Sequence, residues 1–330
     1  MAAMRGEDEI IRHLRRRFPA GGRVRVGIGD DAAVLAGDAR RDWVLTTDLL
    51  VEDVHFVRRW QPARAVGWKA LARSLSDVAA MGATPVAALV ALAVPADTSD
   101  AWVKDFFDGL GLLARRLGVR VIGGDLSSAA QIVADVQVFG EVERGRALLR
   151  RGARPGDLLF VSGTLGLSQL GLLRLQSRGA SVQPVFKRAL RAHFYPWPRV
   201  ALARALQRYR PSAMIDLSDG LSTDLHHLCE SSRVGACLFA PRLPAVDVPR
   251  ALIRRLRTTG LELALHGGED YQLLFTLPQS RPQPLPNQLA GVRLTAIGEI
   301  TSDPRVVLVD SIGRTRRLAP RGWDHFRSQH

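Results

Sequence analysis

The chain has 330 residues, 46% of them hydrophobic, and a formal net charge of +14, a length sufficient for two domains with cores of their own. Its apolar runs are shorter than a membrane span, and the mixed charges of residues 1–17 are unlike a secretory signal peptide. Two cysteines, Cys229 and Cys237, exclude a disulfide framework, so we expect a reducing, cytoplasmic setting.

Arginine supplies most of the positive charge, because lysine occurs only at positions 69, 104 and 187. The arginines are scattered, and the longest run is residues 15–17. Nucleic-acid-binding proteins usually concentrate such charge on one face, so we expect a solvated arginine-rich surface with neither a nucleic-acid nor a membrane partner. The positive field would still attract phosphate-bearing small molecules.

The first half of the chain alternates between helix and strand patterns. Apolar spacing predicts helices over residues 7–18, 68–81 and 102–117, and strands over residues 24–28, 43–51, 85–94, 119–122 and 132–142. The strand at 119–122 is expected to be buried and to lead into Gly123-Gly124-Asp125. Asp77 falls in the last turn of its helix, where an anion opposes the helix dipole unless a cation compensates it.

The second half begins after residues 144–156, a stretch rich in Arg, Gly and Pro that predicts the connection between the halves. Strands are predicted at 158–162, 214–217, 271–277, 292–300 and 305–309, and helices up to residue 175 and at 186–209, 218–231 and 251–258. The pattern indicates an α+β or α/β fold with one domain over residues 1–148 and a second over residues 149–330.

Residues 27–32 fit the Gly-x-Gly-x-x-Gly/Ala pattern of dinucleotide-binding folds. Asp30 and Asp31 argue against that interpretation, because they would place negative charge where pyrophosphate meets a helix N-terminus. Gly37 would also break the expected helix. The dinucleotide interpretation is therefore the less favoured one.

Aspartates beside Gly, Ser or Thr recur at the predicted ends of strands and helices, namely Asp30, Asp48, Asp77, Asp125 and Asp216. Any one alone is more readily a turn or cap residue, but five are hard to explain in that way. Ser218 or Asp219 could cap the predicted helix at 218–231, although a cap accounts for only one of them. Carboxylate and hydroxyl oxygens suit Mg²⁺, which often shares its coordination with phosphates. The set indicates phosphoryl transfer or ATP use, although the Gly-x-x-x-x-Gly-Lys-Ser/Thr loop and the protein-kinase motifs are absent.

Taken in order, the motifs resemble those of the thiamine-monophosphate kinases, a family of the aminoimidazole-ribonucleotide-synthetase-like (PurM-like) superfamily. They lie at residues 27–33, 46–56, 76–83, 123–125, 152–157, 216–220 and 267–271. The resemblance implies a PurM-like two-domain architecture, with an N-terminal mixed sheet and helices that dimerise and a C-terminal α/β domain. It also implies direct transfer of the ATP γ-phosphoryl group to thiamine monophosphate, giving thiamine diphosphate, with no covalent nucleophile or general base.

The resemblance also assigns site residues. The implied ligands of several Mg²⁺ ions are Asp30, Thr46, Thr47, Asp48, Asp77, Asp125, Asp216 and Asp219; the implied ATP contacts are Gly124, Arg150 and Ser218; the implied substrate contacts are His55, Glu269 and Trp323. Neighbouring Thr46 and Thr47 face opposite sides of a regular strand, so one would bind through its backbone. Arg151 stands where the family usually has serine, which leaves open whether Arg150 or Arg151 contacts ATP.

Two other functions stay open at this point. Another ATP-dependent PurM-like synthetase is one; a selenophosphate synthetase would carry an early reactive cysteine, and this chain has none before Cys229. A non-catalytic nucleotide-binding regulator on the same fold is the other, and it would be expected to have lost carboxylates that are all present here. The expected partners are ATP, thiamine monophosphate and a second copy of the chain, which we expect to pair around residues 43–51.

Overall fold

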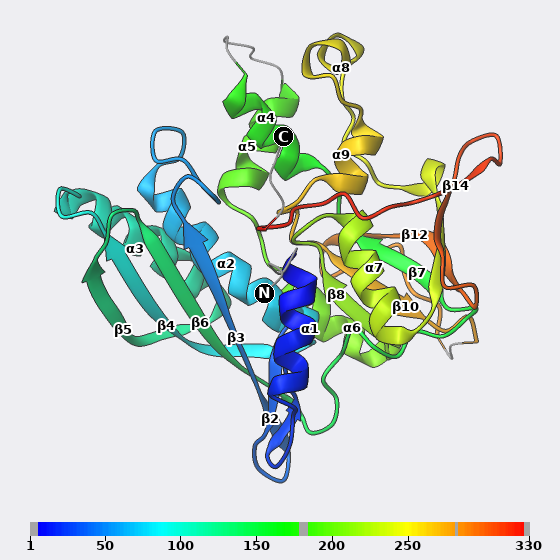
Figure 1. The fold of residues 1–330 in the computed structure, drawn as a ribbon, viewed down its shortest axis with the longest axis horizontal. Coiled ribbons are helices and arrows are strands. Elements are labelled where there is room, and N and C mark those ends of the chain that lie inside the picture. The colour runs from blue at the N-terminus through cyan, green and yellow to red at the C-terminus, as the bar shows by residue number, and fades with distance from the viewer. Residues whose placement is uncertain (1–5, 178–183, 281–282, 327–330) are drawn as a thin grey trace, which may run out of the picture.

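The computed structural model describes residues 6–177, 184–280 and 283–326, which form two sheets with helices packed on them (Figure 1). The first sheet has the spatial order β1-β2-β3-β6-β4-β5. Its strands are β1 (Val24–Val26), β2 (Ala33–Ala36), β3 (Arg41–Val51), β4 (Thr84–Val94), β5 (Arg120–Ser128) and β6 (Val133–Glu143). Helices α1 (Glu7–Arg17), α2 (Ala63–Ala80) and α3 (Asp100–Leu117) belong to the same half.

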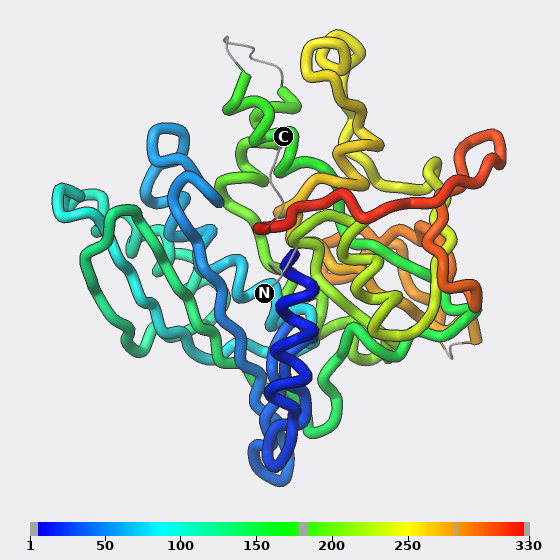
Figure 2. The backbone as a smooth tube through the Cα atoms, viewed as in Figure 1, coloured from blue at the N-terminus to red at the C-terminus, as the bar shows by residue number. Residues whose placement is uncertain are grey.

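The second sheet has the order β14-β13-β9-β12-β7-β10-β8, with β11 (Gln288–Leu289) paired to β12. Its strands are β7 (Leu158–Ser162), β8 (Ala213–Asp216), β9 (Gly235–Phe239), β10 (Leu273–Leu277), β12 (Val292–Thr301), β13 (Val306–Val309) and β14 (Thr315–Arg317). The helices of this half are α4 (Leu167–Gln176), α5 (Pro184–Phe194), α6 (Val200–Leu206), η1 (Gln207–Tyr209), α7 (Leu221–Ser232), η2 (Ala240–Arg242), α8 (Arg250–Leu256) and α9 (Gly260–His266). The chain after β14 crosses this half and ends beside the start of α1 (Figure 2).

Helix α2 joins the two halves. Its sequence is apolar on almost every side, as expected for a helix surrounded by protein. Leu71 and Leu75 pack into the core of the first sheet, whereas Ala79 and Ala80 belong to a cluster that includes Met214 of β8. The last turn of α2, which contains Asp77, therefore lies where the two sheets meet.

Strand β5 differs from the prediction. Residues 119–122 were expected to form a buried strand before a glycine loop, but β5 runs from Arg120 to Ser128 along the edge of the sheet and every residue of it is exposed. Asp125 therefore lies within a strand, not at its end, and the same holds for Asp48 in β3. The start predicted for the helix at 218–231 is also wrong, because α7 begins at Leu221 and leaves Ser218 and Asp219 in the preceding turn.

The glycine-rich stretch near residue 28 leads into strand β2 instead of a helix, which rules out the dinucleotide-binding interpretation. Strand β3 is hydrogen-bonded to β2 on one edge and to β6 on the other. The pairing with β2 covers only residues 42–45 of β3, so residues 46–51 have no strand partner on that edge within the described chain, and pairing of a second copy around residues 43–51 stays a prediction. Within the described residues, we find no helix with the length and apolar character needed to span a bilayer.

Two glycines allow α2 and α3 to touch through their backbones. A Cβ atom on Gly67 would lie 1.9 Å from the carbonyl oxygen of Phe106, and one on Gly109 would lie 1.8 Å from that of Arg64. Gly67→Ala should therefore destabilise the fold by at least about 2 kcal/mol, because the helices must separate.

Urea unfolding monitored by circular dichroism measures this effect. Gly111→Ala on α3 is the matched control, because its added Cβ would meet only the flexible end of Arg115, 3.3 Å away. We expect that control to change the unfolding free energy by less than about 1 kcal/mol. Equal stability of Gly67→Ala and the parent would contradict the close helix contact.

Candidate active site

A cluster of buried carboxylates lies at the end of α2. Thr46 of β3 donates a hydrogen bond from Oγ1 to Asp77 Oδ2 at 2.6 Å. The neighbouring Ser76 donates from Oγ to Oδ2 of Asp216, the last residue of β8, at 2.5 Å. One helical turn thus gathers carboxylates from both halves of the chain.

Arg150 brings two further carboxylates to this cluster. Its guanidinium donates to Asp31 Oδ1 through Nη2 at 2.7 Å and Nε at 3.0 Å, and its backbone N–H donates to Asp30 Oδ1 at 3.2 Å. Arg151, the other candidate for ATP contact, is exposed. Asp31 was absent from the predicted ligand set, although its place beside Asp30 in the sequence was a usable signal.

The carboxylates of the cluster resist ionisation. Burial, and after it the negative charge of Asp31, raises the pKa of Asp30 to about 7 and that of Asp216 to about 8. Burial also raises the pKa of Asp77 well above its usual range, with Asp48 as the next cause. At neutral pH the cluster therefore needs either protons or additional cations.

The residues present fit Mg²⁺. The cluster offers hard oxygen atoms, and Oδ2 of Asp31 is buried without a hydrogen-bond partner. Crowded carboxylates that repel one another are stabilised when a divalent cation lies among them. The residues that the structure gathers for such an ion are Asp30, Asp31, Thr46, Asp77 and Asp216.

A second, more cationic group lies farther along α2. Lys69 is fully buried, and its Nζ is 2.7 Å from Oε2 of Glu269. Arg73, one turn later, is 3.9 Å from Oε1 of the same glutamate and 3.2 Å from Oδ1 of Asp48. Burial alone would raise the pKa of Glu269, but the positive charges of its neighbours, Lys69 foremost and Arg73 with it, hold it at about 2. Glu269 is therefore a permanent carboxylate anion.

The other two predicted substrate residues lie near this group. The backbone N–H of Val51 donates to Nδ1 of His55 at 3.0 Å, and Nε2 of His55 is buried without a partner. Burial, followed by the charge of Arg73, lowers the pKa of His55 to about 3, so this imidazole is neutral. Its ring lies 5.0 Å from that of His325, which in turn accepts a hydrogen bond from Trp323 Nε1 at 3.2 Å.

Some predicted residues are not brought to the cluster. Strand register places Asp48 opposite Val136, then Val90, then Gly124, so Asp48 and Gly124 are separated by three strand spacings, about 14 Å. Asp125 follows Gly124 and is opposite Ala91, so its side chain lies on the other face of the sheet from that of Asp48.

Thr47 also faces away from the cluster. Its Oγ1 donates to Asp135 on β6, whereas the hydroxyl of Thr46 reaches Asp77. The expectation that the two threonines face opposite sides of the strand is therefore confirmed. Thr47 could therefore bind a ligand near Asp77 only through its backbone atoms.

The turn between β8 and α7 forms a third group beside the cluster. Ser218 accepts a hydrogen bond at its backbone oxygen from the N–H of Glu269, at 2.7 Å, and so joins the turn to the substrate residues. Asp219, Asp224 and His227 have ligand atoms that all lie within 4.8 Å of one another, a spacing that could hold a metal ion. Asp224 lies on a helix that the sequence prediction started three residues too early, and it was not singled out.

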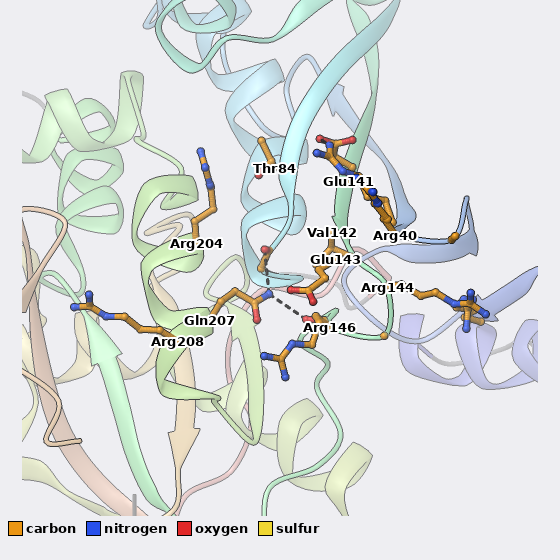
Figure 3. Close-up of a pocket in the computed structure, with 15 residues that line it drawn as sticks. Arg40, Thr84, Glu141, Val142, Glu143, Arg144, Arg146, Arg204, Gln207 and Arg208 are labelled. Carbon is orange, nitrogen blue, oxygen red and sulfur yellow. Dashed lines mark hydrogen bonds and ion pairs between the residues drawn. The ribbon is translucent and has the colours of Figure 1, made fainter. Parts of the chain in front are cut away.

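A large cavity lies elsewhere, between the first sheet and the segment α6–η1 (Figure 3). It measures about 1330 Å³, and Gln207 crosses it with hydrogen bonds to the backbone oxygens of Gly82 and Arg146 at 3.2 and 3.0 Å. Its arginines are Arg25, Arg40, Arg41, Arg144, Arg146, Arg204 and Arg208. None of the predicted site residues lines this cavity, so the volume of a cavity alone would not identify the candidate active site.

Comparison with known proteins places this geometry in a family. Residues 29–142 match the family model of the AIR synthase related protein, N-terminal domain, and residues 154–311 match that of the C-terminal domain. The thiamine-monophosphate kinase of Synechococcus elongatus is 36% identical over 97% of this chain and 96% of its own length. The chain belongs to the thiamine-monophosphate kinase family. The Escherichia coli K12 member is 39% identical over 92% of each chain.

Solved structures agree with this family membership. AaThiL complexed with AMPPCP and TMP is similar at a TM-score of 0.85 and 34% identity, over 97% of each chain. The hydrogenase maturation protein HypE, in its complex with HypF, shares the fold at a TM-score of 0.74 but only 18% identity. The PurM-like two-domain architecture, with mixed sheets and helices in both halves, is thereby confirmed.

Replacing Asp77 by asparagine tests the metal role of the cluster, because the change keeps the size of the side chain and removes one charge. Without Mg²⁺, Asp77→Asn should melt at or above the melting temperature of the parent, since repulsion among buried carboxylates is relieved. Adding Mg²⁺ should raise the melting temperature of the parent and raise that of the variant much less.

Differential scanning calorimetry with and without Mg²⁺ provides the measurement. Asp108→Asn is the matched control, because that carboxylate is exposed on α3, and it should respond to Mg²⁺ as the parent does. A collapse of the Asp77→Asn melting temperature in Mg²⁺-free buffer would show that Asp77 is structural instead.

Proposed function

We propose that this chain transfers the γ-phosphoryl group of ATP to thiamine monophosphate, with Mg²⁺, and releases thiamine diphosphate and ADP. The observation that carries the proposal is that α2 joins an acidic cluster suited to metal and phosphate to the ion-paired group around the anion Glu269. The likeness to AaThiL, complexed with AMPPCP and TMP, supports both the ATP side and the thiamine monophosphate side.

The acceptor in this reaction is a phosphate oxyanion, so the chain needs no nucleophile and no general base. Its task is to position two anions in line and to offset their repulsion. Several Mg²⁺ ions, when bound, would supply positive charge between the two phosphate groups, held by Asp30, Thr46, Thr47, Asp48, Asp77, Asp216 and Asp219. Arg150, whose guanidinium reaches the acidic cluster, would contact ATP together with Ser218 and Gly124.

The group of side chains around Glu269 suits the thiamine part of the substrate. A fixed carboxylate attracts the cationic thiazolium ring, and the face of Trp323 favours the same charge. Oε1 of Glu269 and Nε2 of His55 are buried without hydrogen-bond partners, so both have an unused position for a ligand. The likeness to thiamine-monophosphate kinases, at 36% and 39% identity over most of the chain, favours this function over that of another PurM-like synthetase, and the intact acidic cluster favours it over a non-catalytic regulator.

We also propose a homodimer formed through the face of the first sheet that α2 and α3 leave uncovered. Large apolar residues are exposed there and along the β5 edge, with Leu49 at 53%, Ile122 at 62% and Leu126 at 68%. Asp125 and Gly124, which lie apart from the cluster of their own chain, would then complete the site of the partner. We further propose that the chain divides into one domain over residues 1–148 and a second over residues 149–330. We also propose a cytoplasmic setting, in line with the free thiols of Cys229 and Cys237.

Activity of the purified protein tests the reaction. Incubation with ATP, Mg²⁺ and thiamine monophosphate should give thiamine diphosphate and ADP, and chromatography measures both products. Asp77→Asn should lower turnover on the order of a hundredfold, comparable to the loss of one main electrostatic stabiliser. Product from an aminoimidazole precursor but none from thiamine monophosphate would overturn the assignment.

Mixing two inactive variants tests the shared site. If Asp125 serves the partner, a mixed dimer of Asp77→Asn and Asp125→Asn contains one intact site, so equal mixing and subunit exchange should restore roughly a quarter of parental activity. Light scattering checks that a dimer is present. No gain in activity on mixing, with exchange verified, would mean that each chain uses its own Asp125.

A further inference from the structure

Arg73 occupies a position that the proposed function leaves unused. Lys69, Arg73 and Asp77 follow one another at intervals of four residues, so they lie along one side of α2. Lys69 reaches Glu269, and Asp77 belongs to the acidic cluster. Arg73 therefore lies between the group around Glu269, proposed for thiamine, and the acidic cluster, proposed for metal and ATP.

The guanidinium of Arg73 spans that boundary. Its Nη2 donates to Asp48 at 3.2 Å, and its Nη1 is 3.9 Å from Glu269. The three side chains retain 13%, 25% and 22% exposure respectively, so the group is open to solvent on one side. A small molecule entering there meets one fixed cation between two carboxylates.

The hydrogen bonds of Arg73 are incomplete. A guanidinium has five N–H donors, and among the described residues Asp48 alone accepts one from Arg73. The Nε atom is buried with no acceptor, and Oε1 of Glu269, which Arg73 faces, is also without a donor. Buried polar groups are usually satisfied, so these atoms point to a polar ligand.

We propose that Arg73 forms the subsite for the phosphate monoester of the acceptor, an inference that rests on the function proposed above. The acceptor is a zwitterion with a thiazolium cation and a phosphate dianion, and the site offers a carboxylate and a guanidinium side by side. The planar fork of arginine matches two phosphate oxygens. Asp48 is also a proposed Mg²⁺ ligand, so its carboxylate would be shared between the ion and Arg73. The other N–H donors of Arg73 would then be available to the phosphate.

The other basic groups around Glu269 cannot take this role. Lys69 is fully buried and already paired with Glu269 at 2.7 Å, so it is not exposed to an entering phosphate. Burial and then the charge of Lys69 lower the pKa of His193 to about 3, so His193 is neutral and supplies no charge. Arg73 is thus the cation of this group, within the described chain, that still has donors to offer.

Calorimetric titration with thiamine and with thiamine monophosphate separates the phosphate contact from the other contacts of the substrate. The parent should bind the monophosphate more tightly than thiamine. Arg73→Met should weaken binding of the monophosphate roughly 10- to 100-fold, as expected for lost charged hydrogen bonds, and leave thiamine within about twofold. Arg64→Met, an exposed arginine on the same helix, is the matched control and should bind both as the parent does.

Equal weakening of both ligands, or no weakening of the monophosphate, would overturn the subsite. Arg73→Lys keeps the charge without the fork, so it serves if Arg73→Met does not fold. It should raise the KM for thiamine monophosphate and leave the KM for ATP unchanged, whereas a rise in both would overturn the proposal. Failure of the proposed function is a separate result, seen as absence of thiamine diphosphate from the parent itself.

Discussion

The burial of several like charges at one point is the constraint on which this structure depends. Asp77 and Asp216 come from different halves of the chain, yet the last turn of α2 holds both through Thr46 and Ser76. Their raised pKa values record the energetic cost of that arrangement, because burial and mutual repulsion both oppose ionisation. A fold accepts such a cost where a cation is to be bound, and here the cost is concentrated where the two sheets meet.

Helix α2 sets the order in which the charged groups of the site follow one another. Each helical turn advances about 5.4 Å, so Lys69, Arg73 and Asp77 sample three successive positions along one line. The line runs from the ion pair of Lys69 with Glu269, through the cation Arg73 with its unused donors, to the cluster of carboxylates around Asp77. Close backbone contact with α3 at Gly67 keeps the helix from shifting and so keeps these positions fixed.

Sequence patterns predicted structural features that depend on neighbouring residues, such as helices. They did not predict features that depend on the order of strands in a sheet. Helical spacing predicted a helix at 68–81, which is most of α2 without its first turn, and correctly placed Asp77 in the last turn. The apolar residues of β5 suggested burial, but their exposure follows from the edge position of that strand, which no local pattern encodes. Arg73 was missed for a related reason, since a lone arginine inside an apolar helix resembles a surface residue until its partners Asp48 and Glu269 are known.

The position of Asp125, apart from the other carboxylates, agrees with the same electrostatic constraint. Adding one more anion to a cluster that already resists ionisation would make the single chain harder to fold. On the exposed edge of β5, that charge stays in water and costs little. If the edge of one chain approaches the cluster of another, the last ligand arrives only on assembly, after each chain has folded with the charge that it can tolerate. The distribution of carboxylates between buried cluster and exposed edge is therefore a physical reason for a site shared between two chains.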